Sequence, residues 1–150
     1  MMKRLLLSLF LFSVVPSFAC DCDDDTISQE LVIYTDIIVR GEVLSTTYVK
    51  RVDIETGEKS VLMKVGFLVT SIYKGSEISE VVEVYTDGDN TCGVEFQKGM
   101  SYILFGYYSD HLGKIQGKIK YDVLYTNICM MTQLYSKDVE DRVKELIEPQ

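Results

Sequence analysis

From residue 36 onward, Ile, Val and Thr recur at the spacing of half-buried β-strands, and short polar segments interrupt them. Turns are expected at residues 55–58 and 74–76, and a loop at residues 87–90, because each of these stretches carries a glycine among polar residues. The segments between them predict five strands, at residues 36–54, 60–73, 81–85, 101–108 and 118–126.

Helical patterns occur at both ends of this β region. Thr26 and Gln29 have the spacing of a capping box, which predicts a short helix through about Tyr34. Ser136 is expected to cap a C-terminal helix whose apolar face carries Val139, Val143, Leu146 and Ile147. The fold class is therefore mainly β: an OB-fold-like five-stranded barrel with a short N-terminal helix and a C-terminal helix.

Residues 1–19 have the layout of a secretory signal peptide. Lys3 and Arg4 form a basic start, residues 5–15 form an apolar core, and Ser17-Phe18-Ala19 offers small residues at a cleavage site. A retained membrane anchor is the alternative, but the apolar stretch is short and an acidic run follows it. Cleavage would leave residues 20–150 as one domain that begins with a free α-amino group on Cys20.

All four cysteines (Cys20, Cys22, Cys92 and Cys129) lie in this predicted mature part. An even number of cysteines in an exported chain indicates two disulfides, in any of three connectivities that spacing alone does not separate. Lipidation of Cys20 is a rival interpretation, which would anchor the protein in a membrane. It would leave an odd number of thiols, and Ser17 stands where such sites usually have an aliphatic residue.

Charge and composition exclude several functions. Without the two basic residues of the signal, 13 Lys and Arg face 23 Asp and Glu, so nucleic acid and anionic membranes are not expected partners. His111 is the only histidine and falls in a predicted turn, which argues against a catalytic or metal site of the protein's own. We expect a monomer that is not an enzyme and has no cofactor.

Several short motifs together resemble a known family. They are Cys20-Asp21-Cys22 at the predicted mature start, Asp36-Ile37-Ile38-Val39-Arg40-Gly41-Glu42-Val43, Tyr73-Lys74-Gly75, Cys92-Gly93, Gly99-Met100-Ser101-Tyr102-Ile103-Leu104, and the late Cys129. In this order they are similar to the netrin-like domain of the tissue inhibitors of metalloproteinases (TIMPs). The chain lacks that family's third N-domain disulfide and separate C-terminal domain, so it looks like a minimal, single-domain relative.

The resemblance implies disulfides Cys20–Cys92 and Cys22–Cys129 and an inhibitory mechanism. The free amine and the carbonyl oxygen of Cys20 would together bind the catalytic zinc of a target metalloendopeptidase. The implied inhibitory edge consists of Cys20, Asp21, Cys22, Asn90, Thr91, Cys92 and Gly93, and the tip of the first hairpin (residues 49–59) would widen the contact. Asp21 departs from the family, which usually has Thr or Ser at this position.

Two functions therefore follow from the sequence. The first is a secreted inhibitor, extracellular or periplasmic, whose protein partner is a zinc metalloendopeptidase. The second is a netrin-like interaction module without inhibitory activity, either free or lipid-anchored through Cys20. The carboxylate of Asp21 counts against the first function unless the target has a polar or basic pocket, because burying it in an apolar pocket would be unfavourable.

Overall fold

Strands dominate the computed structural model, which describes residues 20–22, 26–89, 91–110 and 112–148. The predicted signal peptide lies outside these residues. In chain order, the elements of the described part are α1 (Gln29–Tyr34), β1 (Ile37–Val52), β2 (Lys59–Lys74), β3 (Val81–Asp87), β4 (Ser101–Ser109), β5 (Lys114–Ile115), β6 (Lys118–Ile119), β7 (Val123–Tyr125), the 3-10 helix η1 (Ile128–Met130), β8 (Gln133–Leu134) and α2 (Lys137–Ile147). The prediction of a mainly β fold is confirmed.

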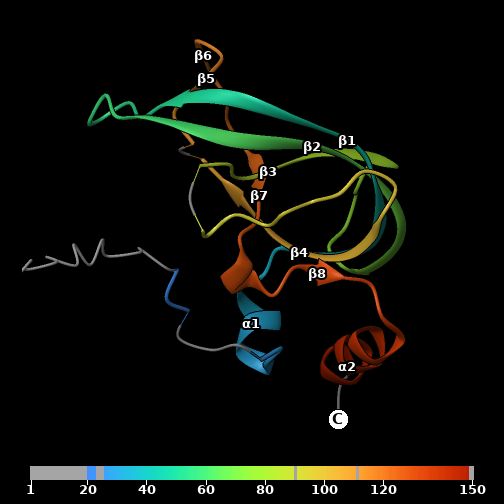
Figure 1. The fold of residues 1–150 in the computed structure, drawn as a ribbon. Helices are drawn as coiled ribbons and strands as arrows, with labels where there is room; N and C mark the ends of the chain where they lie inside the picture. Colours follow the sequence, from blue (N-terminus) through green and yellow to red (C-terminus); the bar gives the residue numbers. More distant parts are fainter. Residues whose placement is uncertain (1–19, 23–25, 90, 111, 149–150) are drawn as a thin grey trace, which may run out of the picture.

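Five of the strands pair into a closed ring (Figure 1). β1 pairs with both β2 and β4, and β2 pairs with β3. β7 closes the ring between β3, to which it is parallel, and β4, to which it is antiparallel. This arrangement is consistent with the predicted OB-fold-like architecture. The short strands β5, β6 and β8 extend the sheet beyond the ring.

The long β1–β2 hairpin bends around the ring, and Gly41 lies at one of its irregular points. The β1–β2 register shifts at three places, one of them between Arg40 and Gly41. Such bulges bend a strand and increase its twist. A Cβ atom at Gly41 would lie 2.3 Å from the carbonyl oxygen of Leu68 and 2.4 Å from the ring of Phe67. Glycine therefore allows the two strands to approach closely at this bend.

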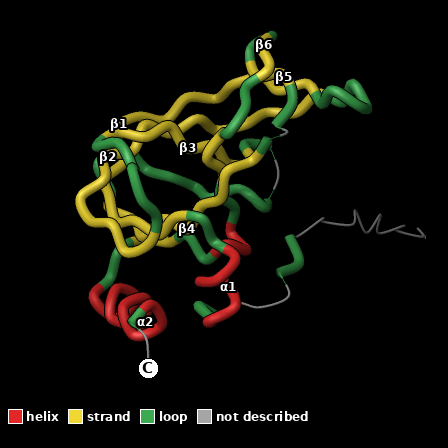
Figure 2. Tube along the Cα trace, turned by 180° about the vertical axis from the view of Figure 1, so that it is seen from behind, coloured by secondary structure: helices red, strands yellow, loops and turns green. Residues whose placement is uncertain are grey.

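Strands β1 and β4 bury side chains on both faces, because the ring interior covers one face and the helices cover the other. On β1, Ile37 and Val39 belong to the cluster that also contains Phe67, whereas Ile38 belongs to a second cluster. That second cluster joins Val32 of α1 and Val143 of α2 to strands β1 and β4; its buried residues are Ile27, Val32, Ile38, Ile103, Phe105 and Val143. Both helices accordingly lie at the same end of the molecule (Figures 1 and 2).

The helices confirm the predicted segments, with one correction at a cap. Ser136 caps α2, since its hydroxyl accepts a hydrogen bond from the Val139 nitrogen at 3.3 Å. α1 is capped by Ser28 and not by Thr26, because it is the Ser28 hydroxyl that accepts from the Leu31 nitrogen at 3.2 Å. Ser28 and Ser136 each precede a first turn that carries an acidic residue, which favours a helix start at these positions.

The predicted fifth strand at residues 118–126 is wrong as a single element. Its first part forms β6, which pairs with β5, and its second part forms β7 inside the ring. Asp122 separates the two with φ +50°, a left-handed conformation that a continuous strand does not contain. The preceding Tyr121 is 70% exposed and contributes no buried side chain to the core at this point.

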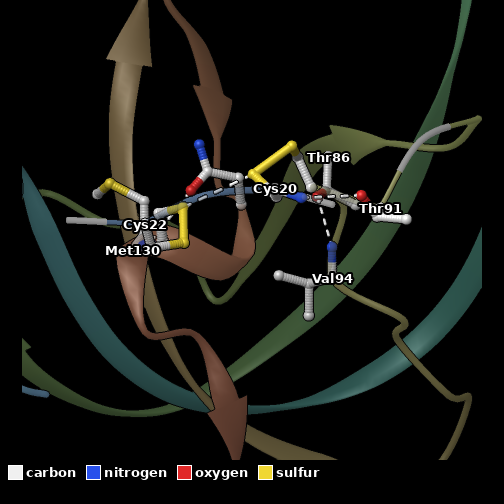
Figure 3. The surroundings of a disulfide bond; sticks show 9 residues. Cys20, Cys22, Thr86, Thr91, Val94 and Met130 are labelled. Atoms are coloured by element: carbon white, nitrogen blue, oxygen red, sulfur yellow. Dashed lines mark hydrogen bonds between the residues drawn. A yellow bond between two sulfur atoms is a disulfide. The ribbon is translucent and has the colours of Figure 1, made fainter. Parts of the chain in front are cut away.

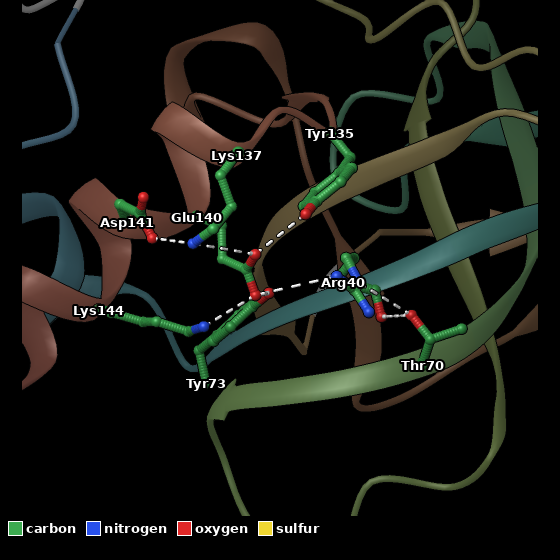
Figure 4. A network of polar contacts seen from close by, with 8 residues as sticks. All are labelled: Arg40, Thr70, Tyr73, Tyr135, Lys137, Glu140, Asp141 and Lys144. Atoms are coloured by element: carbon green, nitrogen blue, oxygen red, sulfur yellow. Dashed lines mark hydrogen bonds and ion pairs between the residues drawn. The ribbon is translucent and has the colours of Figure 1, made fainter.

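Glu140 attaches α2 to the ring through a buried polar network (Figure 4). Its carboxylate accepts hydrogen bonds from the hydroxyls of Tyr73 at 2.8 Å and Tyr135 at 3.0 Å. Lys144 pairs with it at 3.0 Å and Arg40 at 3.8 Å. The hydrogen bonds, led by that from Tyr73 and then Lys144, lower the pKa of Glu140 to about 2. Glu140 is therefore ionised at neutral pH although only 7% of it is exposed.

Candidate functional site

Two disulfides tie the N-terminal segment to the rest of the fold (Figure 3). Cys20 is bonded to Cys92, with the two Cα atoms 5.0 Å apart, and Cys22 is bonded to Cys129, with the Cα atoms 5.2 Å apart. These are the same pairs that the family resemblance implies. The bonds join three separate segments: residues 20–22, the loop that follows β3, and η1.

The two disulfides also lie against each other. The Sγ atoms of Cys20 and Cys129 are 3.7 Å apart, although they belong to different bonds. The sulfurs of Cys20, Cys22 and Cys129 all lie within 4.8 Å of one another, a grouping that free cysteines could use to hold a metal. Metals bind the thiolate form, and all four cysteines are bonded as disulfides. The role of the cluster is therefore structural: its two disulfides attach residues 20–22 to the rest of the fold.

The loop between β3 and residue 94 is held at both of its ends. On the β3 side, the Gly88 nitrogen donates to the Val61 carbonyl at 2.9 Å, and the Asp89 carboxylate accepts from the Val61 nitrogen at 2.8 Å. On the far side, the Val94 nitrogen donates to the buried Thr86 hydroxyl at 2.9 Å. The loop is thus fixed to β2 and β3 on either side of Cys92.

Gly93 lies directly against the end of β3. A Cβ atom at this position would be 1.8 Å from the carbonyl oxygen of Asp87 and 2.7 Å from its carbonyl carbon. Backbone atoms of a strand cannot move aside as a flexible side chain can, so only glycine fits here. Gly93 therefore sets the path of the chain immediately after Cys92, and with it the position of the Cys20–Cys92 bond.

A further backbone contact joins this loop to the turn that carries Cys129. The Ile128 nitrogen donates to the Cys92 carbonyl at 2.9 Å. The Asn127 side chain caps η1 by accepting from the Met130 nitrogen at 3.1 Å. The two cysteine partners of the N-terminal segment are thus held together by a hydrogen bond as well as through the disulfides.

The resulting edge is partly open to solvent. Asp21 and Thr91 are exposed, and Cys20, Cys22, Cys92 and Gly93 are half-buried. The Cys20 nitrogen donates a hydrogen bond to the Thr91 hydroxyl, with 3.0 Å between the two atoms. The structure therefore places six of the seven residues of the predicted inhibitory edge together. Asn90 lies outside the described residues, as do the acidic residues 23–25.

Sequence reasoning did not identify the residues that support this edge. Thr86 and Asn127 orient the two cysteine-bearing turns, and Val61 holds the loop from the neighbouring strand. A threonine at the end of an apolar strand is common, and so is an asparagine in a turn. Neither residue type therefore indicates from the sequence that it supports the edge. His111, which we interpreted as a surface loop residue, lies outside the described residues.

The ring of strands and the stapled N-terminal edge define a small, disulfide-bonded β domain. Comparison with protein-family models gives this class a name: the family described as tissue inhibitor of metalloproteinase matches residues 18–140. The chain belongs to this family. A search of curated proteins found no match. Members of the family are inhibitors and not enzymes, and their partners are proteins, so both conclusions hold for this chain at the family level.

The described residues contain no helix that is both long and apolar enough to cross a membrane.

Proposed function

We propose that the mature protein begins at Cys20 and is a secreted, monomeric inhibitor of zinc metalloendopeptidases. The observation that supports this most directly is the position of the Cys20 nitrogen. It lies on an edge that two disulfides hold in place, next to the exposed residues Asp21 and Thr91. Cleavage after Ala19 would convert this nitrogen from an amide into an α-amino group.

An α-amino group and the carbonyl oxygen of the same residue are well suited to a catalytic zinc. Such a zinc has three protein ligands and keeps a further position for water. The amine and the carbonyl oxygen of Cys20 would displace that water and close a five-membered ring with the metal. An α-amino group titrates close to neutral pH, so a substantial fraction is unprotonated and has a free lone pair. Because the disulfides already fix the residue, little conformational entropy is lost on binding.

Asp21 restricts the targets that such an edge would accept. Its carboxylate is exposed directly beside the proposed chelating residue. Moving an ionised carboxylate into an apolar pocket without a partner is strongly unfavourable. The target protease would therefore present a cationic or hydrogen-bond-donating group to this side chain.

The exposed carboxylate of Asp21 also favours the second candidate function. A netrin-like interaction module, free or lipid-anchored through Cys20, would bind its protein partner without approaching a metal. In that case the acidic N-terminal segment would be an ordinary solvated surface.

Adding one alanine before Cys20 separates the two functions. The extra residue moves the free amine away from the disulfide-bonded cysteine, so inhibition of a panel of metalloendopeptidases is expected to fall to background. The matched control carries the alanine after Gln150 and should inhibit as the wild type does. Full inhibition by the N-terminally extended protein would exclude the zinc mechanism.

The mass of the exported protein tests the premise directly. We expect a chain that starts at Cys20, with four hydrogens fewer than the reduced form because two disulfides have formed. An added diacylglycerol mass on Cys20 would instead establish the lipid anchor.

A further inference from the structure

The hydroxyl of Thr91 lies 3.0 Å from the Cys20 nitrogen and accepts its hydrogen bond. We infer that Thr91 is a positioning residue for inhibition: it holds the α-amino group of Cys20 in the orientation that binds the target's zinc. The inference rests on the proposed function and adds a specific residue to it. The family resemblance placed Thr91 in the inhibitory edge as part of a loop that contacts the target. It did not give Thr91 a role in orienting the amine.

Thr91 is suited to this role because its own backbone is fixed. The next residue, Cys92, is covalently bonded to Cys20 and also accepts a hydrogen bond from Ile128. Gly93 packs against the backbone at the end of β3, and the Val94 nitrogen donates a hydrogen bond to the Thr86 hydroxyl. A hydroxyl on a backbone fixed in this way stays within hydrogen-bond distance of the Cys20 nitrogen, whereas a hydroxyl on a free loop would not.

The chemistry of the amine explains what this hydrogen bond would accomplish. A free α-amino group rotates about its N–Cα bond, and in only part of that rotation do the lone pair and the carbonyl oxygen face the same metal. A bond from one N–H to Thr91 restricts the rotation before binding. Metal coordination uses the lone pair and makes the remaining N–H groups stronger donors, so the bond to Thr91 persists and strengthens in the complex.

The same bond gives Thr91 a signature that a purely structural residue lacks. The proposed role needs only a hydroxyl at the position that accepts from the Cys20 nitrogen. Serine should therefore restore inhibition, whereas valine, which has the shape of threonine without the hydroxyl, should inhibit less well because the amine is no longer oriented.

The experiment compares the mature wild-type protein with Thr91→Val, Thr91→Ser and Thr47→Val. Valine removes the hydroxyl and keeps the shape, serine restores the hydroxyl, and Thr47 is an exposed threonine of β1 that serves as the control. Inhibition constants are measured with isolated metalloproteinase catalytic domains and a fluorogenic peptide, and thermal unfolding confirms that each variant is folded.

We expect Thr91→Val to weaken inhibition about three- to tenfold, the range of one hydrogen bond. Thr91→Ser and Thr47→Val should behave as the wild type. If the wild type inhibits, and Thr91→Val inhibits equally well, the role of Thr91 is overturned and the proposed function stands. If the wild type inhibits no metalloproteinase, the proposed function fails and this inference fails with it.

Discussion

Removing the disulfides one at a time and then together tests the connectivity that holds the N-terminal edge. The bonds close loops of 72 and 107 residues. On the chain-entropy model, each bond alone would stabilise the fold by ~4.4 and ~4.8 kcal/mol respectively. The two loops overlap, however, because both contain the segment from Cys22 to Cys92. With one bond intact, the other closes only about 39 residues, through Cys20–Cys22 and the segment from Cys92 to Cys129.

This effective loop corresponds to ~4 kcal/mol for either bond when the other is present. Replacing Cys20 and Cys92 by alanine should therefore destabilise the protein by about as much as replacing Cys22 and Cys129. Removal of both bonds should cost ~8–9 kcal/mol, which is comparable to the whole stability of a typical domain. The two pair variants are expected to fold, and the variant without cysteines is expected to be largely unfolded.

Urea unfolding followed by far-UV circular dichroism measures these differences, and thiol titration of the unfolded proteins should find no free thiol in either pair variant. A loss below ~1 kcal/mol in one pair variant would refute the reasoning. A bond that closes a loop of about 39 residues cannot contribute so little on this model. Two free thiols in a pair variant would likewise show that the bonds join other partners.

Three further changes test other parts of the structure. Gly93→Ala should reduce the urea midpoint and weaken inhibition together, because its Cβ would meet the Asp87 carbonyl at 1.8 Å; the comparison is Gly99→Ala, whose Cβ has nothing within 4 Å but whose φ of +80° is itself unfavourable for alanine, so it should lower the urea midpoint less and leave inhibition unchanged, and equal effects of the two on inhibition would contradict the argument. The pKa of Glu140 falls from 4.5 to about 2 on folding, so its contribution to stability is complete above the higher value and is lost as the pH falls toward the lower one. Glu140→Gln should therefore be less stable than the wild type at pH 7 and show a smaller further loss between pH 5 and pH 2 in urea titrations, and parallel pH profiles of the two proteins would exclude this role. Asp21→Thr should broaden the range of metalloendopeptidases inhibited, measured as inhibition constants over a panel, whereas an unchanged range would mean that this side chain does not enter the target's pocket.

The strands of the first hairpin and the C-terminal helix were predictable because their signals are local. Alternating β-branched residues define β1 and β2, and Ser136 followed by an apolar stripe defines α2. The predictions failed where two local solutions compete. Ser28 and Thr26 are both good caps, and the chain through Asp122 could continue as a strand or turn away. Packing against the ring decides such cases, and packing is not visible in a short window of sequence.

The candidate site divides in the same way. The number of cysteines, the position of Cys20 at a cleavage site and the motifs of the family are properties of the sequence itself. They were sufficient to predict the family and, through the resemblance to it, the two disulfides, whereas the inhibitory role of the edge stays a prediction. They did not predict which polar groups hold that edge. The side chains of Thr86 and Asn127 accept from backbone nitrogens, and the Val61 nitrogen donates to Asp89, and such contacts have no sequence signature of their own.

The contact between the Cys20 nitrogen and Thr91 shows most clearly what only the tertiary structure decided. The two residues are 71 positions apart, and no local preference relates them. Closure of the ring and the two disulfides bring them to hydrogen-bond distance, and Gly93 sets the path of the loop. The sequence by itself determined that a cysteine would stand at the predicted mature terminus, and folding determined which hydroxyl meets its nitrogen.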